Sequence, residues 1–234
     1  HILGPGKLLR RAIEADRFMS LILYGPPGVG KTALAHLIAE KSRAHFVSLN
    51  AVTAGVADIR KVAQEAVEVR ALSGQRTVLF IDEIHRFTRV QQDALLPDVE
   101  RGAITLIGAS TQNPFFAIIP ALSSRSQIFE FKPLSREHVR SLILRALADK
   151  ERGFGNRPVT LTEDALELII AQSNGDARRA LNALELGVLS TPAGPDGAVL
   201  YDLSTAEESI QKKALAYDED EHYDTISAFI KSCR

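Results

Sequence analysis

Apolar positions along the first part of the chain follow two kinds of spacing. Apolar residues three and four positions apart predict helices, whereas short runs of consecutive apolar residues predict strands buried on both faces. The helices predicted in this way are 7–16, 32–42, 57–72 and 91–100, and the strands are 21–24, 46–49, 78–81, 105–110 and 128–131. Because helices and strands alternate, we expect an α/β fold in which a parallel sheet lies between two layers of helices.

The pattern changes after Pro133, where the strand-like runs stop. The stretches that follow carry helical periodicity only: 136–149, 163–173 and 177–189. Ser135 and Thr162 each precede one of these stretches, and their hydroxyls can accept the backbone N–H groups of a first helical turn. The division predicts an α/β domain over 1–133 and a small all-helical domain over 134–190.

The last segment, 191–234, is predicted to be a linker followed by the start of a further helical region. Residues 191–205 contain two prolines and two glycines, which is typical of a loop. Ser204 and Glu207 have nearly the spacing of a capping box, so we expect a helix to begin there. The chain starts with His rather than Met, and its last residues resemble a helix cut in mid-pattern. We therefore expect a fragment of a longer protein.

Composition places the chain among ordinary globular proteins. Of its 234 residues, 45% are hydrophobic and 24% are charged, which excludes mainly disordered, collagen-like and coiled-coil chains. No apolar run approaches the ~20 residues that a membrane span needs. The single cysteine, Cys233, allows no internal disulfide and favours a reducing compartment. The net charge of −1 divides into +4 over 1–134 and −5 over 135–234, so charge by itself indicates no nucleic-acid partner.

The clearest chemical motif is Gly-Pro-Pro-Gly-Val-Gly-Lys-Thr, which fits the phosphate-binding pattern G-x-x-x-x-G-K-[ST] between a predicted strand and a predicted helix. Glycines let backbone N–H groups approach a phosphate, and the positive end of the next helix favours an anion. We expect Lys31 to bind the β- and γ-phosphates of ATP and Thr32 to bind Mg²⁺. The alternative is a glycine-rich turn that precedes Lys-Thr by chance. The residues assigned to ATP or ADP here are Gly25, Pro26, Pro27, Gly28, Val29, Gly30, Lys31 and Thr32.

A second motif, Asp82-Glu83, follows the continuous apolar run 78–81, at the sheet edge where open α/β sheets bind ligands. Asp82 is the second candidate ligand of Mg²⁺, after Thr32. Glu83 is the candidate group that orients and polarises a water for attack on the γ-phosphate. Adjacent acids at a strand end can instead cap the following helix, which would be the preferred interpretation of an isolated pair.

Together the two motifs resemble those of AAA+ ATPases, which have a P-loop ATPase domain followed by a helical lid. The other AAA+ parts follow in order. Residues 107–111, Ile-Gly-Ala-Ser-Thr, resemble the sensor 1 strand. The resemblance assigns to Ser110, or to its neighbour Thr111, a contact with the attacking water or the γ-phosphate. The alternative is that these hydroxyls cap a turn.

Two arginines complete the resemblance. Residues 121–125 resemble the Ser-Arg-Cys segment of clamp loaders, with Ser126 in place of the cysteine. This makes Arg125 a candidate finger for the ATP of a neighbouring subunit, because a guanidinium spreads its charge over phosphate oxygens. An ion pair within the chain is the alternative. Residues 175–182 resemble the sensor 2 segment, so Arg178 is expected to reach the nucleotide from the lid, whereas Arg179 faces away.

Several longer segments narrow the resemblance to the RarA/MgsA family, the Werner-helicase-interacting ATPases of replication forks. The segments are 49–60, 82–87, 91–97, 108–115 and 222–231. The sequence departs from the residues usual in this family at Thr88-Arg89, Gln112 and Ser126. Residues 190–205 match the family poorly. The resemblance also places Ile2 and Leu3 in an adenine pocket. The alternative is that they form a hydrophobic stub packed on the core, and the two interpretations are compatible with each other. His85 and Arg86 would link the ATP site to a DNA or subunit interface, but a packed or ion-paired loop is the preferred interpretation.

The resemblance implies an Mg-ATP-hydrolysing enzyme that acts on DNA at stalled or damaged replication forks, with single-strand-binding protein among its partners. It implies a homotetramer whose assembly region lies beyond Arg234, so we expect the fragment to be mainly monomeric. The expected location is cytoplasmic and nucleoid-associated in a bacterium, or nuclear in a eukaryote. One alternative is an AAA+ unfoldase, disfavoured because 51–56 lacks an aromatic grip residue. The other is a nucleotide-gated scaffold.

Overall fold

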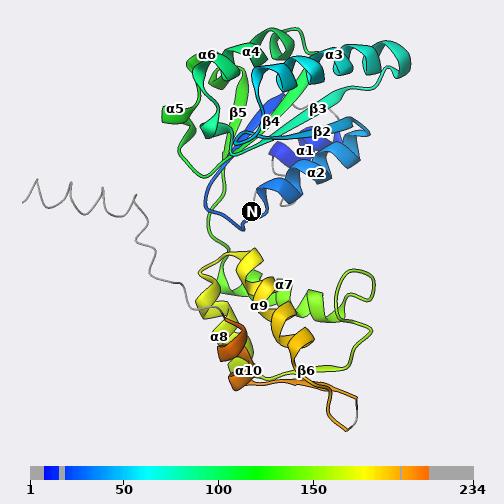
Figure 1. Ribbon diagram of the computed structural model, residues 1–234, viewed down its shortest axis with the longest axis vertical. Helices are drawn as coiled ribbons and strands as arrows, with labels where there is room; N and C mark the ends of the chain where they lie inside the picture. The colour runs from blue at the N-terminus through cyan, green and yellow to red at the C-terminus, as the bar shows by residue number, and fades with distance from the viewer. Residues whose placement is uncertain (1–7, 16–18, 196, 211–234) are drawn as a thin grey trace, which may run out of the picture.

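The structure, a computed structural model, describes residues 8–15, 19–195 and 197–210. Figure 1 shows an α/β domain built around one sheet, followed along the chain by a domain that consists mostly of helices. Ile2 and Leu3, assigned to an adenine pocket, lie outside the described residues, as does the segment 211–234. Among the residues described, no helix combines the length and the apolar character that a membrane crossing requires.

The sheet of the α/β domain has the strand order β2-β3-β4-β1-β5, and all its strand pairs are parallel. Its strands are β1 (Ser20–Tyr24), β2 (His45–Asn50), β3 (Thr77–Asp82), β4 (Ile104–Ser110) and β5 (Ser126–Glu130). In the middle of the sheet, Ile107 of β4 lies opposite Leu21 of β1 on one side and Phe80 of β3 on the other. The predicted parallel sheet is confirmed, and the carboxyl ends of β1, β3 and β4 meet at one edge.

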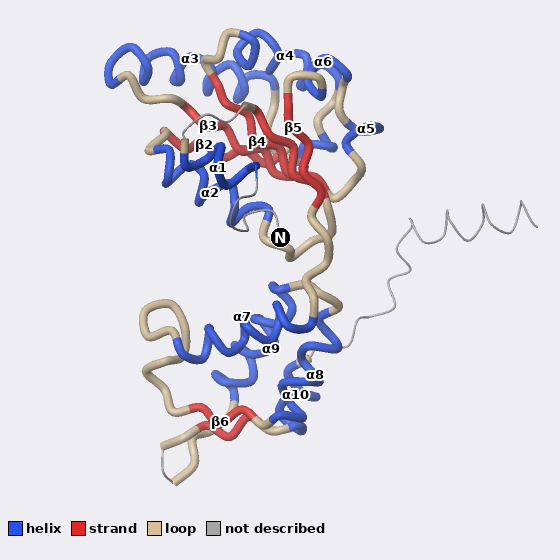
Figure 2. Tube along the Cα trace, turned by 180° about the vertical axis from the view of Figure 1, so that it is seen from behind, coloured by secondary structure: helices blue, strands red, loops and turns tan. Residues whose placement is uncertain are grey.

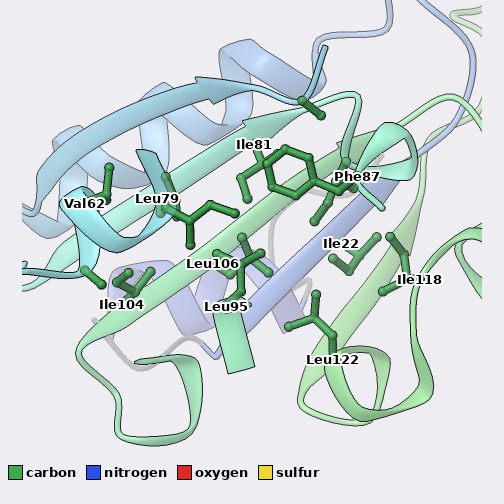
Figure 3. Packing of buried hydrophobic residues seen from close by; sticks show 14 of the residues in the cluster. Ile22, Val62, Leu79, Ile81, Phe87, Leu95, Ile104, Leu106, Ile118 and Leu122 are labelled. Carbon is green, nitrogen blue, oxygen red and sulfur yellow. The ribbon is translucent and has the colours of Figure 1, made fainter. Parts of the chain in front are cut away.

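Helices cover both faces of this sheet. One face carries α1 (Leu8–Glu14) and α2 (Lys31–Ser42), and the other carries α3 (Val56–Ser73), α4 (Arg89–Glu100) and α6 (Pro120–Ser123). Successive strand residues point to opposite faces, so Leu21 and Leu23 pack with the first set of helices and Ile22 with the second. Figure 3 shows the second core, in which Leu95 and Leu122 lie against strand residues such as Ile22. This packing fixes the strand ends that carry the predicted chemistry.

The second domain has its own apolar core. Its helices are α7 (Arg136–Ala148), α8 (Glu163–Ser173), α9 (Ala177–Ser190) and α10 (Leu203–Ser209). Ile143, Ile169 and Leu184, from three of these helices, are almost fully buried in one cluster. The predicted N-caps are confirmed: Ser135 accepts from the His138 N–H and Thr162 from the Ala165 N–H.

The segment predicted as a linker is instead part of this domain. It contains a strand, β7 (Val199–Tyr201), which pairs in parallel with β6 (Val159–Leu161); the β6 label in Figure 2 marks this pair. Tyr201 is fully buried, and its hydroxyl bonds to the Ala183 carbonyl at 3.0 Å and to Ser209 Oγ at 2.5 Å. Three-residue strands carry too little periodicity to be predicted, and each finds its partner far away in the sequence.

The predicted start of the next helix is wrong by two residues. Asp202, not Ser204, caps α10, because its carboxylate accepts from the Thr205 N–H at 3.0 Å. Ala206 of α10 belongs to the same core as Tyr201. The helix therefore packs on α8 and α9 rather than beginning a separate region.

Candidate active site

The loop between β1 and α2 carries the predicted phosphate motif. Its glycines at positions 25, 28 and 30 have φ angles of 144°, 69° and 93°, a region that residues with a side chain rarely adopt. The Gly25 N–H donates to the Ser110 carbonyl at 3.1 Å, which ties the loop to the end of β4. No side chain of the described residues caps α2, and its first turn holds no acidic residue. The first N–H groups and the dipole of this helix therefore form a place suited to a phosphate.

Lys31 lies within this loop, with only 8% of the residue exposed. Its ammonium donates to the carbonyls of Gly25 at 2.6 Å and Pro26 at 2.8 Å. Burial lowers the Lys31 pKa, while the nearby carboxylates of Glu83 and Asp82 act in the opposite direction. The lysine and the two acids predicted for ATP hydrolysis therefore share one site.

The remaining residues of the motif surround Lys31. Pro27 and Gly30 are exposed, Pro26 and Gly28 are partly buried, Val29 is buried, and Thr32 is exposed in the first turn of α2. The proline and valine side chains shape the loop, whereas the Thr32 hydroxyl is open to a ligand.

Asp82 is the last residue of β3, and Glu83 follows it in the left-handed region at φ 55°. A residue with a side chain is strained there, and such strain is concentrated at functional sites. The Asp82 carboxylate accepts from the Glu83 N–H at 3.1 Å. A 3-10 turn, η1 (Ile84–Arg86), begins directly afterwards. Glu83 does not cap it through its side chain, which argues against the simple capping interpretation.

The residues available for Mg²⁺ fit a hard cation. Carboxylate and hydroxyl oxygens are the ligands that magnesium prefers, and it usually takes the rest of its shell from phosphates and water. Thr32 offers an exposed hydroxyl beside Lys31, and the half-buried Asp82 carboxylate is close enough to Lys31 to influence its pKa. Among the described residues, no cluster of three or more His, Cys, Asp or Glu side chains could hold a metal alone.

Ser110 and Thr111, the two sensor 1 candidates, lie in different environments. Ser110 is fully buried, and its hydroxyl bonds to the Gln112 carbonyl at 2.7 Å and to the Gln112 N–H at 3.0 Å. It also lies 3.2 Å from His85 Nδ1. Thr111 is exposed, and its hydroxyl lies 3.4 Å from Glu83 Oε2. Of the two hydroxyls, the one of Thr111 is open to the solvent beside Glu83.

Arg125 lies at the end of α6, outside this cluster. Its guanidinium pairs with Glu100 Oε1 at 2.7 Å and donates to the Ala121 carbonyl at 2.8 Å. The side chain is 43% exposed. The ion-pair alternative therefore holds within the single chain, and the partial exposure leaves the guanidinium accessible to another subunit.

The second domain meets the phosphate loop at the start of α9. The Ala177 N–H donates to the Gly28 carbonyl at 3.0 Å. Asp176 lies so close that a Cβ added to Gly28 would be 1.6 Å from Asp176 Oδ1. The same carboxylate caps α9, accepting from the N–H groups of Arg178 at 2.8 Å and Arg179 at 3.1 Å. Only glycine at position 28 permits this contact.

Arg178 completes the cluster from this second domain. Its charge lowers the Lys31 pKa, which places the two cations near each other. An arginine held near the phosphate-loop lysine suits a ligand with several negative charges. Arg179 Nε instead lies 4.0 Å from Asp176 Oδ2.

The sequence does not reveal the contacts of two side chains in this site. Asp176 was not assigned to the site, although an aspartate directly before a helical stretch is a recognisable N-cap signal. The preferred interpretation of His85, a packed or ion-paired loop, is confirmed in that its side chain is only 6% exposed and Nε2 lies 3.2 Å from Glu83 Oε2. Its partner is therefore the candidate water-activating group itself.

Comparisons with known proteins agree with this architecture. A family model described as "ATPase family associated with various cellular activities (AAA)" matches residues 21–134, and one described as "AAA C-terminal domain" matches residues 155–234. Among solved structures, the RuvB Holliday junction branch migration motor of Thermotoga maritima superposes with a TM-score of 0.65 at 24% identity. The match covers 86% of this chain and 64% of that one, and it shows the fold.

Curated proteins match over the whole chain. It is 47% identical to replication-associated recombination protein A of Bacillus subtilis (strain 168), spanning 55% of that protein, and 42% identical to the Escherichia coli (strain K12) protein of the same name, spanning 53%. It is 36% identical to the ATPase WRNIP1 of Dictyostelium discoideum, where 97% of this chain matches 28% of that protein. The chain thus spans about half the length of the bacterial relatives.

Fold and site define a protein of the AAA class, with a nucleotide-binding α/β domain and a helical C-terminal domain. Within that class, the chain belongs to the RarA family of replication-associated recombination proteins.

Proposed function

We propose that this chain is the ATP-hydrolysing part of an enzyme that acts on DNA at stalled or damaged replication forks. The observation that carries the proposal is the convergence of Lys31, the Asp82-Glu83 pair and the start of α9 on one phosphate-binding loop. The whole-chain similarity to replication-associated recombination proteins supports the biological setting. Such an enzyme would work on the chromosome, in a bacterial nucleoid or a eukaryotic nucleus.

The phosphate loop would bind the β- and γ-phosphates through backbone N–H groups and the Lys31 ammonium. Lys31 now donates to two carbonyls of its own loop, and a nucleotide would replace these with phosphate oxygens. That exchange pairs the ammonium with an opposite charge, which the carbonyl oxygens do not carry. Thr32 and Asp82 would hold Mg²⁺, which would neutralise charge that develops on the phosphates.

Glu83 would accept the proton of the attacking water, in keeping with its place at the end of β3. Thr111, whose exposed hydroxyl lies 3.4 Å from Glu83 Oε2, is the better placed of the two sensor candidates to contact this water or the γ-phosphate. Arg178 would bind the phosphates from the helical domain. Together these groups would position the water and stabilise the transferred phosphoryl group.

Arg125 would serve a neighbouring subunit rather than its own site. It lies away from Lys31 and is partly exposed, in an ion pair with Glu100. A surface pair of this kind contributes little stability, so the arginine can leave it at small cost. We infer that it reaches a neighbour's nucleotide in the oligomer of the full-length protein, a homotetramer by the family resemblance.

The proposal is tested with the full-length protein by measuring its ATPase rate alone and with single-stranded, gapped and forked DNA. We expect DNA to raise the rate and unfolded protein to leave it unchanged. The Lys31→Ala variant, which lacks the phosphate-binding cation, is the negative control. Stimulation by unfolded protein alone would support an unfoldase, and ATP binding without turnover would support a nucleotide-gated scaffold.

A further inference from the structure

His85 is buried next to the proposed catalytic glutamate, and both of its ring nitrogens have partners. Its side chain is only 6% exposed. Nε2 lies 3.2 Å from Glu83 Oε2, and Nδ1 lies 3.2 Å from Ser110 Oγ. The imidazole therefore connects the end of β4 to the end of β3, at the edge of the sheet where the phosphate loop lies.

The partners of His85 indicate where the proton of its ring lies. A carboxylate only accepts, so Nε2 carries the proton that faces Glu83. In a neutral ring Nδ1 is then an acceptor. It lies 3.2 Å from the Ser110 hydroxyl, whose single proton can go to Nδ1 or to the Gln112 carbonyl 2.7 Å away. Burial lowers the His85 pKa, although the Glu83 carboxylate opposes this, and a lower pKa favours the neutral ring. Ser110, His85 and Glu83 thus form one continuous chain of contacts, in which the His85 ring lies between the other two side chains.

We propose that His85 is a positioning residue, which fixes the orientation of the Glu83 carboxylate through the Ser110–His85–Glu83 chain. The inference rests on the proposed function, because it concerns the group that activates water in ATP hydrolysis. It also gives Ser110 a role that suits its full burial: Ser110 acts through His85 and does not contact the nucleotide.

The need for such a residue follows from the position of Glu83. Its backbone is in the left-handed region and its side chain is 30% exposed, so a long side chain would otherwise sample many rotamers in solvent. The described contacts of the carboxylate, from His85 and Thr111, both go to Oε2. This arrangement leaves Oε1 to accept a proton from water, with its direction set by the fixed Oε2.

The test compares three substitutions of His85 in the full-length protein. His85→Ala removes the chain. The side-chain amide of His85→Gln can place an N–H near the position of Nε2, whereas that of His85→Asn reaches only the position of Nδ1. We expect kcat for ATP hydrolysis to fall ~10–100-fold in the Ala and Asn variants, the loss that displacement of a catalytic group by about 1 Å produces. The Gln variant should recover most of the rate. The Kd for ATP should change less than twofold in all three.

Two controls distinguish the loss of this positioning contact from a general loss of structure. In a Glu83→Gln background, His85→Ala should produce no further loss, because residues that act as one unit are not additive. His36→Ala, a histidine exposed on α2, should keep the parent kcat. Equal rates for the Gln and Asn variants, a parent rate for His85→Ala, or a further loss in the Glu83→Gln background would overturn the proposal. If Glu83→Gln and Lys31→Ala themselves hydrolysed ATP normally, the proposed function would fail instead.

Discussion

The two domains contribute to the site in different ways. On the side of the α/β domain, Lys31, Glu83 and Ser110 follow or end neighbouring strands, which pair in parallel and are packed by helices on both faces. On the side of the helical domain, or lid, Asp176 caps α9 and Arg178 lies in its first turn. The direct contacts described there are one backbone hydrogen bond and the approach of one carboxylate to a glycine.

This difference suggests a division of labour. A sheet held by continuous hydrogen bonds and an apolar core keeps its groups in place whether or not a ligand is bound. A lid held at the phosphate loop by few contacts is able to change position when a nucleotide adds or removes an interaction. The loop before α9 also contacts the connection between the two domains, because the Leu134 N–H donates to the Gly175 carbonyl at 3.0 Å. Gly28 is the point where the phosphate loop contacts the start of α9.

The largest effect is expected on the sheet side. Glu83→Gln keeps the shape of the side chain and removes its ability to accept a proton. We expect kcat to fall ~10²–10⁴-fold, the usual contribution of a general base, while ATP affinity is preserved. Single-turnover hydrolysis and calorimetric titration of the full-length protein measure the two effects separately. Turnover at the parent rate would show that Glu83 does not activate the water.

The next effect is expected where the two sides meet. Gly28→Ala places a Cβ on the Asp176 carboxylate and a side chain at a positive φ, whereas Gly30→Ala shares the positive φ but meets no atom within 4 Å. The backbone strain is ~1–2 kcal/mol in either case. We therefore expect Gly28→Ala to weaken ATP binding ~10-fold more than Gly30→Ala. Equal dissociation constants for the two variants would show that the lid contact does not matter for binding.

Much of the sheet side could be predicted from the sequence, because its signals are local. The run 78–81 is apolar throughout since the strand is buried on both faces, and the phosphate motif occupies a single loop. The sequence left open whether Ser110 or Thr111 contacts the nucleotide. Neighbouring residues at a strand end point in opposite directions, and the sequence does not show which one is covered. The turn at Gln112 and the ring of His85 cover Ser110.

The lid side was less predictable, because its contacts join distant segments. The pairing of β7 with β6 and the approach of Asp176 to Gly28 involve residues far apart in the sequence. An aspartate before a helix predicts a cap, as observed for Asp176. The same signal does not reveal that the capping carboxylate also lies against another segment, here Gly28. At α10 the sequence predicts a start at Ser204, whereas in the structure the Asp202 carboxylate caps the helix by accepting from the Thr205 N–H.

A smaller effect is expected from the lid arginine. Arg178→Ala removes a charged group near Lys31 and should weaken ATP binding ~10–100-fold, in line with ~1.5–3 kcal/mol for a hydrogen bond to a charged group. Arg179→Ala is the matched control. Its guanidinium makes a partly exposed pair with Asp176, and such pairs are worth ~0–1 kcal/mol. Equal losses in the two variants, measured as dissociation constants, would contradict the assignment of Arg178.

The smallest effect on activity is expected within the lid itself, at Tyr201. Tyr201→Phe keeps the buried ring and removes the hydroxyl that bonds to the Ala183 carbonyl and Ser209 Oγ. Because buried polar groups then lose a partner, the free energy of unfolding should fall by ~1–3 kcal/mol. The first turn of α9 lies apart from this bond, so ATP affinity and kcat of the folded protein should stay within twofold. Chemical denaturation and ATPase assays at a temperature well below the transition check both expectations. A large loss of activity in a folded Tyr201→Phe protein would show that the lid transmits its internal packing to the site, and that the two sides are less independent than their contacts indicate.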